Sequence, residues 1–176
     1  MRVLGIDPGS LRTGWGLVTG GPSDARVVDC GVVTLGSRRP LPDRLATLYR
    51  GMEELIRRLE PSTAAVEAPF FGAGARSALQ LAHARGVILA ALGNAGVEVA
   101  EYSPATVKKS VTGSGRADKT QVGRMVVQLL RLSEPPAPHD LSDALAVALC
   151  HMTSVRQSVL IDAGARRSRR AASAPE

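Results

Sequence analysis

The 176-residue chain contains few of the residues that mark a disulfide-rich, metal-finger or membrane protein. Its two cysteines, Cys30 and Cys150, lie in apolar segments without a Cys-x-x-Cys spacing, which indicates neither a disulfide framework nor a zinc site. No apolar run approaches the roughly 18 residues needed to cross a bilayer, and the first residues lack the zones of a secretory signal. We therefore expect a cytoplasmic protein without a membrane partner, its cysteines reduced and buried.

The overall composition is typical of a folded domain with a polyanionic partner. The chain is 44% hydrophobic and 22% charged, which excludes a disordered protein, and its length fits one domain. A net charge of +6 favours nucleic acid as the partner. Residues 156–176 hold five arginines against two acidic residues, a net +3, so only the other +3 belongs to the rest of the chain.

The hydrophobic patterns predict an α/β fold with a mixed five-stranded sheet flanked by helices. Strands are expected at 2–7, 13–18, 26–35, 64–67 and 97–102, and helices at 42–59, 77–92, from 103, at 118–132 and at 140–156. This order is βββαβαβ followed by helices, which indicates a mixed sheet. We predict one folded domain over 1–157 and a basic disordered tail over 158–176, where Ala, Ser and Arg dominate without apolar periodicity.

One predicted helix carries a ridge of small residues. Ala78, Ala82, Gly86 and Ala90 recur at intervals of four, a spacing that lets another helix approach closely. Two interpretations stay open: the ridge packs onto the chain's own sheet, or it forms the seam of a homodimer.

Four acidic residues occupy positions where they can converge. Asp7 and Glu67 each end a predicted strand, and adjacent strands would place both at one edge of the sheet, where open α/β sheets commonly bind ligands. Asp140 and Asp143 lie about one turn apart on one face at the start of the last helix. Alternatives are an Asx turn at Asp7, a solvated strand end at Glu67 and helix capping by the two later aspartates.

A cluster of four carboxylates predicts a site for divalent cations. Such groups repel one another unless cations are present, and oxygen ligands suit magnesium or manganese. In two-metal phosphodiester hydrolysis one ion positions hydroxide and the other stabilises the leaving 3′-oxygen. We therefore expect two Mg²⁺ ions, with Mn²⁺ as a substitute, held by Asp7, Glu67, Asp140 and Asp143. His139 is either a proton shuttle or a neutral surface histidine.

Several ordered motifs resemble the bacterial RuvC Holliday-junction resolvases. They cover about residues 1–157 and include Gly5-Ile-Asp-Pro-Gly-Ser10 with Thr13-Gly14, Val66-Glu67, Ser77-Ala-Leu79, Ala84-Arg-Gly86, Lys119-Thr-Gln-Val122 and Asp140-Leu-Ser-Asp143. The resemblance implies a ribonuclease-H-like fold, a homodimer and paired symmetric nicks across a four-way DNA junction in recombination and repair. It also implies cooperation with the RuvAB branch-migration motor.

By the same resemblance the four carboxylates fall on the family's metal-ligand positions, which implies an active crossover junction endodeoxyribonuclease. Some family members have histidine in place of the third carboxylate. Here Asp140 holds that position and the histidine is its neighbour, His139.

Basic residues gather around the Gly113–Gly115 loop. Lys108, Lys109, Arg116 and Lys119 are expected to contact phosphates, with strongly salt-dependent binding as the consequence. The alternative is a solvated basic surface. Lys108 and Lys119 match basic positions at the family's active site, so they are favoured over Lys109.

Two adjacent aromatics follow Glu67 in a chain that has only five. Phe70 and Phe71 are candidates for stacking on unpaired bases, and the alternative is that they close the core. Phe70 best matches the family's base-stacking aromatic. Arg76, beside this loop, is a candidate contact to the DNA backbone.

Three rival functions remain at this stage. The segment Asp7–Ser10 resembles the phosphate loop of actin-like phosphotransferases, but no second Asp-x-Gly segment is present. A non-catalytic junction-binding protein would use the same fold without cleavage. A related nuclease acting on other DNA or RNA structures would keep the metal cluster, because the cluster alone does not select the substrate.

Overall fold

The sheet of this protein is mixed and five-stranded. The computed structural model describes residues 1–68 and 74–172, apart from the side chains of Arg76, 159–160 and 162–172. The spatial order is β3-β2-β1-β4-β5, with β1, β2 and β3 antiparallel and with β4 and β5 parallel to β1. The predicted mixed sheet and the adjacency of the first and fourth strands are thus confirmed. The strands are β1 (Arg2–Asp7), β2 (Arg12–Thr19), β3 (Arg26–Thr34), β4 (Thr63–Glu67) and β5 (Val99–Tyr102).

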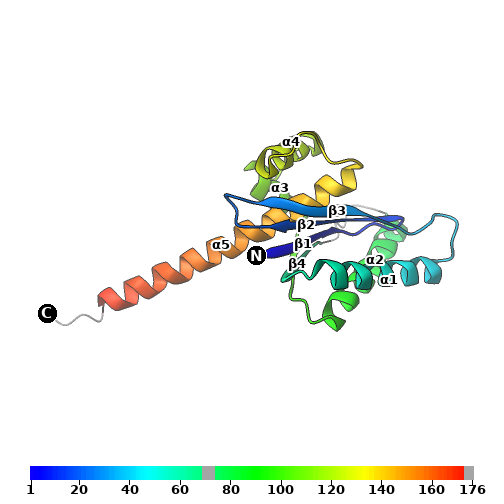
Figure 1. The fold of residues 1–176 in the computed structure, drawn as a ribbon, viewed down its shortest axis with the longest axis horizontal. Helices are drawn as coiled ribbons and strands as arrows, with labels where there is room; N and C mark the ends of the chain where they lie inside the picture. The colour runs from blue at the N-terminus through cyan, green and yellow to red at the C-terminus, as the bar shows by residue number, and fades with distance from the viewer. Residues whose placement is uncertain (69–73, 173–176) are drawn as a thin grey trace.

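Helices cover both faces of the sheet (Figure 1). On one face lie α1 (Leu41–Leu59) and α2 (Ala75–Asn94); on the other lie α3 (Pro104–Thr112), α4 (Lys119–Leu130) and α5 (His139–Ala172). The Ser103 hydroxyl caps α3 by accepting a hydrogen bond from the Thr106 amide, and Asp118 caps α4. The caps fix where these helices start.

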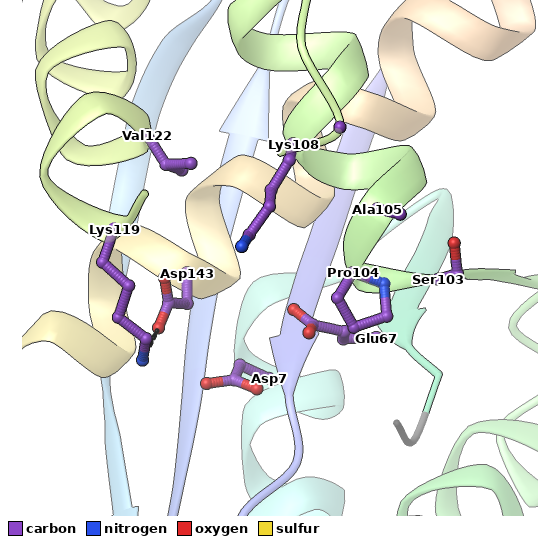
Figure 2. Close-up of a pocket in the computed structure, with 10 residues that line it drawn as sticks. Asp7, Glu67, Ser103, Pro104, Ala105, Lys108, Lys119, Val122 and Asp143 are labelled. Atoms are coloured by element: carbon purple, nitrogen blue, oxygen red, sulfur yellow. Dashed lines mark hydrogen bonds and ion pairs between the residues drawn. The ribbon is translucent and has the colours of Figure 1, made fainter. Parts of the chain in front are cut away.

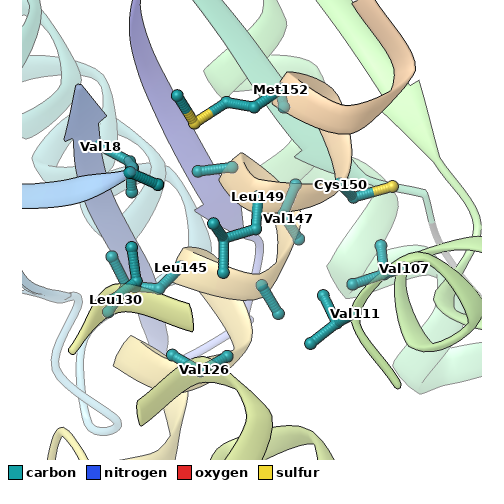
Figure 3. Packing of buried hydrophobic residues seen from close by; sticks show 14 of the residues in the cluster. Val18, Val107, Val111, Val126, Leu130, Leu145, Val147, Leu149, Cys150 and Met152 are labelled. Atoms are coloured by element: carbon teal, nitrogen blue, oxygen red, sulfur yellow. The ribbon is translucent and has the colours of Figure 1, made fainter. Parts of the chain in front are cut away.

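Alternation along the strands divides the interior into two apolar layers. Leu4 and Ile6 of β1 are fully buried in the layer under α1 and α2. Val3 and Ala65 point to the opposite layer, where they pack with Leu145 and other residues of α3, α4 and α5 (Figure 3). Because successive side chains of a strand alternate, Asp7 and Glu67 share the face of Val3 and Ala65.

A strip of glycines lets α5 lie directly on the sheet. Gly5 pairs with Gly16 across β1 and β2, and Asp7 pairs with Gly14. A Cβ atom on Gly5 would lie 2.1 Å from the Ala144 carbonyl oxygen, and one on Gly14 would lie 2.2 Å from the Asp140 carbonyl oxygen. The first turns of α5 are therefore held against the strand ends that carry Asp7.

The ridge of small residues on α2 does not pack onto the sheet. Ala84 and Ile88 supply the buried face of α2, whereas Ala82, Gly86 and Ala90 are exposed. Within the described part of the chain, no heavy atom outside the helix's own backbone lies within 4 Å of a Cβ built on Gly86. The interpretation that the ridge packs onto the chain's own sheet was therefore wrong.

The last helix is longer than the sequence predicted. α5 continues to Ala172 and extends past the sheet (Figure 1), so the expectation of a disordered tail was wrong for residues 158–172. Alanine and arginine are strong helix formers, and a loss of apolar periodicity removes a packing face without breaking the helix. Both cysteines are free, Cys150 buried and Cys30 half-buried. Among the described residues, no helix combines the length and apolar character that crossing a membrane requires.

Candidate active site

The first two acidic residues are placed by neighbouring parallel strands. Ile6 of β1 is in register with Val66 of β4, so Asp7 and Glu67 follow at the same edge of the sheet. Both side chains line one cavity of about 560 Å³. Figure 2 shows them beside each other, below the start of α3.

The other two acidic residues come from the first turns of α5. Asp143 lines the same cavity as Asp7 and Glu67. Asp140 is not part of the cavity wall, but its charge reaches Asp7, and its Oδ2 lies 3.8 Å from Nη1 of Arg12. The structure thus gathers three of the four predicted ligands and places the fourth, paired with Arg12, at the margin.

Burial and like charge act together on these carboxyl groups. Burial, followed by the charges of Glu67, Asp143 and Asp140, raises the pKa of Asp7 from 3.8 to about 8. Burial and the charge of Asp143 raise the pKa of Glu67 to about 7, against the opposing effect of Lys119 and Lys108. At neutral pH the cavity therefore retains protons that a bound cation would displace.

Two lysines bring positive charge to the same cavity. Nζ of Lys119 donates a hydrogen bond to Oδ2 of Asp143 at 3.3 Å, and this ion pair raises the pKa of Lys119. Lys108 points into the space between Asp143 and Glu67 (Figure 2). Lys109, by contrast, lines a separate pocket between α3 and α5, and Arg116 is exposed outside the cavity lining.

The start of α3 forms a wall of the cavity that the sequence analysis did not identify. Ser103, Pro104 and Ala105 line it, together with Gly115 and Val122. Glu67 is in register with Tyr102, the residue before Ser103, so a correct pairing of the last two strands would have revealed this wall. The N-terminus of a helix favours anions, which suits a phosphate-bearing substrate.

The sequence and the fold both match one known family. The family model described as crossover junction endodeoxyribonuclease RuvC matches residues 3–151. The chain belongs to the RuvC family. It is 49% identical to RuvC of Chloroflexus aggregans over 151 residues, which cover 86% of this chain and 92% of the relative. It is 52% identical to RuvC of Moorella thermoacetica over 153 residues, covering 86% and 90%.

A solved RuvC structure shows the same architecture. The structure of Thermus thermophilus RuvC in complex with Holliday junction substrate superposes with a TM-score of 0.85 at 37% identity, covering 90% of this chain and 96% of that one. The fold is ribonuclease-H-like, and the chain is a crossover junction endodeoxyribonuclease, a metal-dependent nuclease of the RuvC family. Membership in this family sets aside the actin-like phosphotransferase and the non-catalytic binding protein.

The donor set of this RuvC site fits a hard divalent cation. Carboxylate oxygens are the ligands that such ions prefer, and a cation would offset both the burial and the mutual repulsion that raise the pKa values of Asp7 and Glu67. As the side chains stand, no three His, Cys, Asp or Glu residues in the described ranges enclose a metal-sized space. Because Lys119 pairs with Asp143, an entering cation competes with that ammonium group.

The remaining predicted residues fall into two groups. His139 is the first residue of α5 and is exposed outside the cavity lining. Phe70, Phe71 and the side chain of Arg76 lie outside the described residues. Arg12 was not predicted, and only its contact with Asp140 in the folded chain identifies it.

Proposed function

We propose that this chain resolves four-way DNA junctions by two-metal-ion hydrolysis, with Asp7, Glu67, Asp140 and Asp143 as the metal ligands. Magnesium is the expected ion and manganese a substitute. The observation that carries the proposal is the convergence of Asp7, Glu67 and Asp143 on one cavity, in which burial and mutual repulsion raise the pKa of Asp7 to about 8 and that of Glu67 to about 7. Asp140 lies one turn before Asp143 and pairs with Arg12. We propose that Asp140 exchanges this pairing for a metal ion and so becomes the fourth ligand.

The chain's own residues have distinct parts in this reaction. The bound ions supply a water-derived nucleophile and stabilise the leaving 3′-oxygen. Asp7 and Glu67 are held by the strand ends, so their carboxylates keep a fixed separation during the reaction. Lys119, whose Nζ pairs with Asp143 in this structure, would be free to bind a phosphate oxygen when that carboxylate holds a cation.

The phosphate backbone is bound around the cavity. Lys108 and the first residues of α3, Pro104 and Ala105, line the space where a phosphate would lie. We also propose phosphate contacts for Arg116 and Arg76 and base stacking for Phe70 and Phe71. His139, exposed beside Asp140, is the candidate proton shuttle.

The exposed ridge of α2 supports a homodimer. Ala82, Gly86 and Ala90 form a shallow surface, and Leu79 near it is 58% exposed. Two copies of this ridge can pack closely because none of its side chains is larger than a methyl group. Paired symmetric nicks need two active sites, which a dimer supplies, and we propose that the RuvAB motor delivers the junction to that dimer.

The nuclease proposal is tested by strand-mapped cleavage. Wild type and Asp7→Asn are incubated with a labelled mobile junction, a linear duplex of the same sequence and an RNA–DNA hybrid, each with Mg²⁺, Mn²⁺ or EDTA. The expected result is paired symmetric nicks in the junction alone, absent in EDTA and in the variant. Preferential cutting of the duplex or hybrid would overturn the substrate, and undiminished cutting by Asp7→Asn would overturn the site.

The dimer is tested by sedimentation of Gly86→Arg. The added side chain projects from the ridge, so this variant is expected to be monomeric at micromolar concentration, whereas wild type is dimeric. Gly123→Arg on α4 is the matched control, because a Cβ there also meets no described atom within 4 Å. A dimeric Gly86→Arg protein would place the seam elsewhere.

A further inference from the structure

Arg44 is a buried charge without an acidic partner among the described residues. It lies in the first turn of α1, four residues before the fully buried Leu48, and is only 8% exposed. Arginine is almost never buried this deeply unless it is paired. In the described part of the chain Arg44 takes part in no salt bridge, and its buried Nε has no hydrogen-bond partner. Burying an unpaired guanidinium is unfavourable, so the role of Arg44 is to be sought in the contact that it does make.

Among the described residues, this guanidinium donates its hydrogen bond to the turn that follows Asp7. Nη1 of Arg44 donates to the carbonyl oxygen of Ser10 at 3.1 Å. Ser10 lies three residues after Asp7 in the loop between β1 and β2. Because the acceptor is a backbone carbonyl, the contact fixes the path of the main chain and does not depend on the serine side chain.

Close contacts hold this turn on both sides of Ser10. A Cβ atom on Gly9 would lie 1.9 Å from the Arg12 carbonyl oxygen, so the backbone folds closely on itself there. On the far side, the Leu35 amide donates to the Leu11 carbonyl oxygen at 2.9 Å. Arg44 holds the segment between these two points, and it does so from the opposite face of the sheet to the cavity.

The same turn connects one carboxylate with the cationic partner of another. Asp7 enters it at the end of β1, and Arg12, which pairs with Asp140, leaves it at the start of β2. A shift of the turn would therefore move Asp7 directly. It would also move Arg12, the cationic partner of Asp140. A displacement of about 1 Å is enough to impair a catalytic constellation.

We propose that Arg44 is a positioning residue for the metal site, which it serves by holding the Ser10 carbonyl and hence the turn between Asp7 and Arg12. The inference rests on the proposed role of the four carboxylates as metal ligands. It predicts that Arg44 sets metal affinity without touching metal or DNA. Residues that orient metal ligands typically change metal affinity about tenfold to a hundredfold when they are lost.

The test compares Arg44→Met, Arg44→Lys and the control Arg50→Met, an exposed position of the same helix. Binding of Mn²⁺ to the metal-free proteins is measured at one fixed pH from the EPR signal of free Mn²⁺. Thermal unfolding in EDTA and junction binding in EDTA are measured on the same samples. Junction cleavage is then followed as a function of Mg²⁺ concentration.

Arg44→Met is expected to bind Mn²⁺ about tenfold or more weakly and to need correspondingly more Mg²⁺ for half-maximal cleavage. Its junction affinity in EDTA should equal that of wild type. Arg44→Lys keeps one donor for the carbonyl and should recover part of the affinity, while Arg50→Met should match wild type. The lysine variant also supplies the measurement if Arg44→Met does not fold.

A loss of thermal stability with unchanged Mn²⁺ affinity in both Arg44 variants would reduce Arg44 to a packing role and overturn the inference. Asp7→Asn separates this failure from a failure of the proposed function. If Asp7→Asn binds Mn²⁺ as well as wild type does, the carboxylate site itself is misassigned. If Asp7→Asn loses Mn²⁺ and the Arg44 variants do not, only the positioning role fails.

Discussion

The character of the site is set by individual carboxyl groups whose surroundings oppose their ionisation. The pKa of Asp7 is raised to about 8, first by burial and then by Glu67, Asp143 and Asp140. An unfolded chain would release that proton near pH 4. In the pH range between these values the folded, metal-free protein binds a proton that the unfolded chain does not, so its stability falls as pH rises towards 8.

Replacing Asp7 with a neutral isostere is therefore expected to abolish cleavage while stabilising the metal-free protein. At pH 9 in EDTA, the free energy of unfolding of Asp7→Asn should exceed that of wild type by about 1–2 kcal/mol. This is a typical gain for a stabilising substitution at an active site. At pH 5 the difference should nearly vanish, because Asp7 is protonated there. Urea unfolding at both pH values measures this, and a variant less stable than wild type at pH 9 would contradict the electrostatic account.

The same raised pKa values predict that metal binding is coupled to proton release. A cation needs Asp7 and Glu67 ionised, and their pKa values in the metal-free fold are about 8 and about 7. Affinity for Mn²⁺ should rise between pH 6 and 8, by roughly tenfold per pH unit for each proton displaced. Calorimetric titration in buffers of different ionisation enthalpy counts the protons, and a flat affinity over this range would disprove the coupling.

At the scale of elements, the decisive arrangement is α5 lying on glycines of β1 and β2. Side chains at these strand positions would lift the helix, and with it Asp140 and Asp143, away from the strand ends. The close approaches at Gly5 and Gly14 are to backbone carbonyl oxygens, which cannot rotate aside as a flexible side chain would. The distance between the two pairs of carboxylates is thus set by the absence of two Cβ atoms.

Gly5→Ala should consequently damage cleavage more than folding. The added methyl group overpacks the interface with Ala144, at a cost of about 1–3 kcal/mol of stability, and the shifted helix should lower the cleavage rate by about a hundredfold. Gly123→Ala in α4 is the control, since it meets no described atom and should gain about 0.5–1 kcal/mol. Urea unfolding and single-turnover cleavage check both changes; an active Gly5→Ala protein would show that α5 tolerates the shift.

The order of the elements was predictable because it depends on local patterns. Alternation and helical spacing located all five strands and the starts of all five helices within a few residues, since burial of one face imposes those periods. The extent of α5 was not predictable, because the residues after 158 have helix-forming composition but no apolar face to pack. The exposure of the α2 ridge was equally undecided, since a small residue suits both a close contact and an open surface.

The carboxylates of the site could be predicted from the sequence because their residue type and their place at element ends are both visible in it. Asp7, Glu67 and Asp143 line one cavity; the first two end buried strands and the third lies near the start of a buried helix, positions that the sequence pattern indicates. Arg12 and Arg44 act through contacts with distant segments, which no local pattern encodes. For Arg44 one signal was present: it continues the buried stripe of Leu48 and Met52 at a spacing of four.

At the scale of the whole molecule, positive charge is concentrated at the C-terminal end. Residues 166–170 contain four arginines. They belong to the part of α5 that extends beyond the sheet (Figure 1). Such a segment, distant from the cavity, can attract DNA phosphates without taking part in the chemistry.

Deleting residues 161–176 should therefore weaken junction binding without abolishing metal-dependent cutting. The slope of log affinity against log salt concentration should become shallower by about one for each DNA phosphate that an arginine no longer neutralises. A full-length protein with glutamine at the four arginine positions separates charge from helix length and should behave like the deletion. Fluorescence anisotropy at several salt concentrations measures the slope; a truncated protein without any cleavage would contradict this division of labour.

The position of Asp140 and Asp143 on the last helix has a consequence during protein synthesis. While the ribosome is still translating the first 139 residues, the growing chain holds Asp7 and Glu67 but neither of the other two proposed ligands. An incomplete or prematurely terminated chain can therefore fold parts of the sheet without becoming a nuclease. DNA-cutting activity is therefore expected only once translation has passed the part of α5 that carries Asp140 and Asp143 and that part lies on the glycine strip.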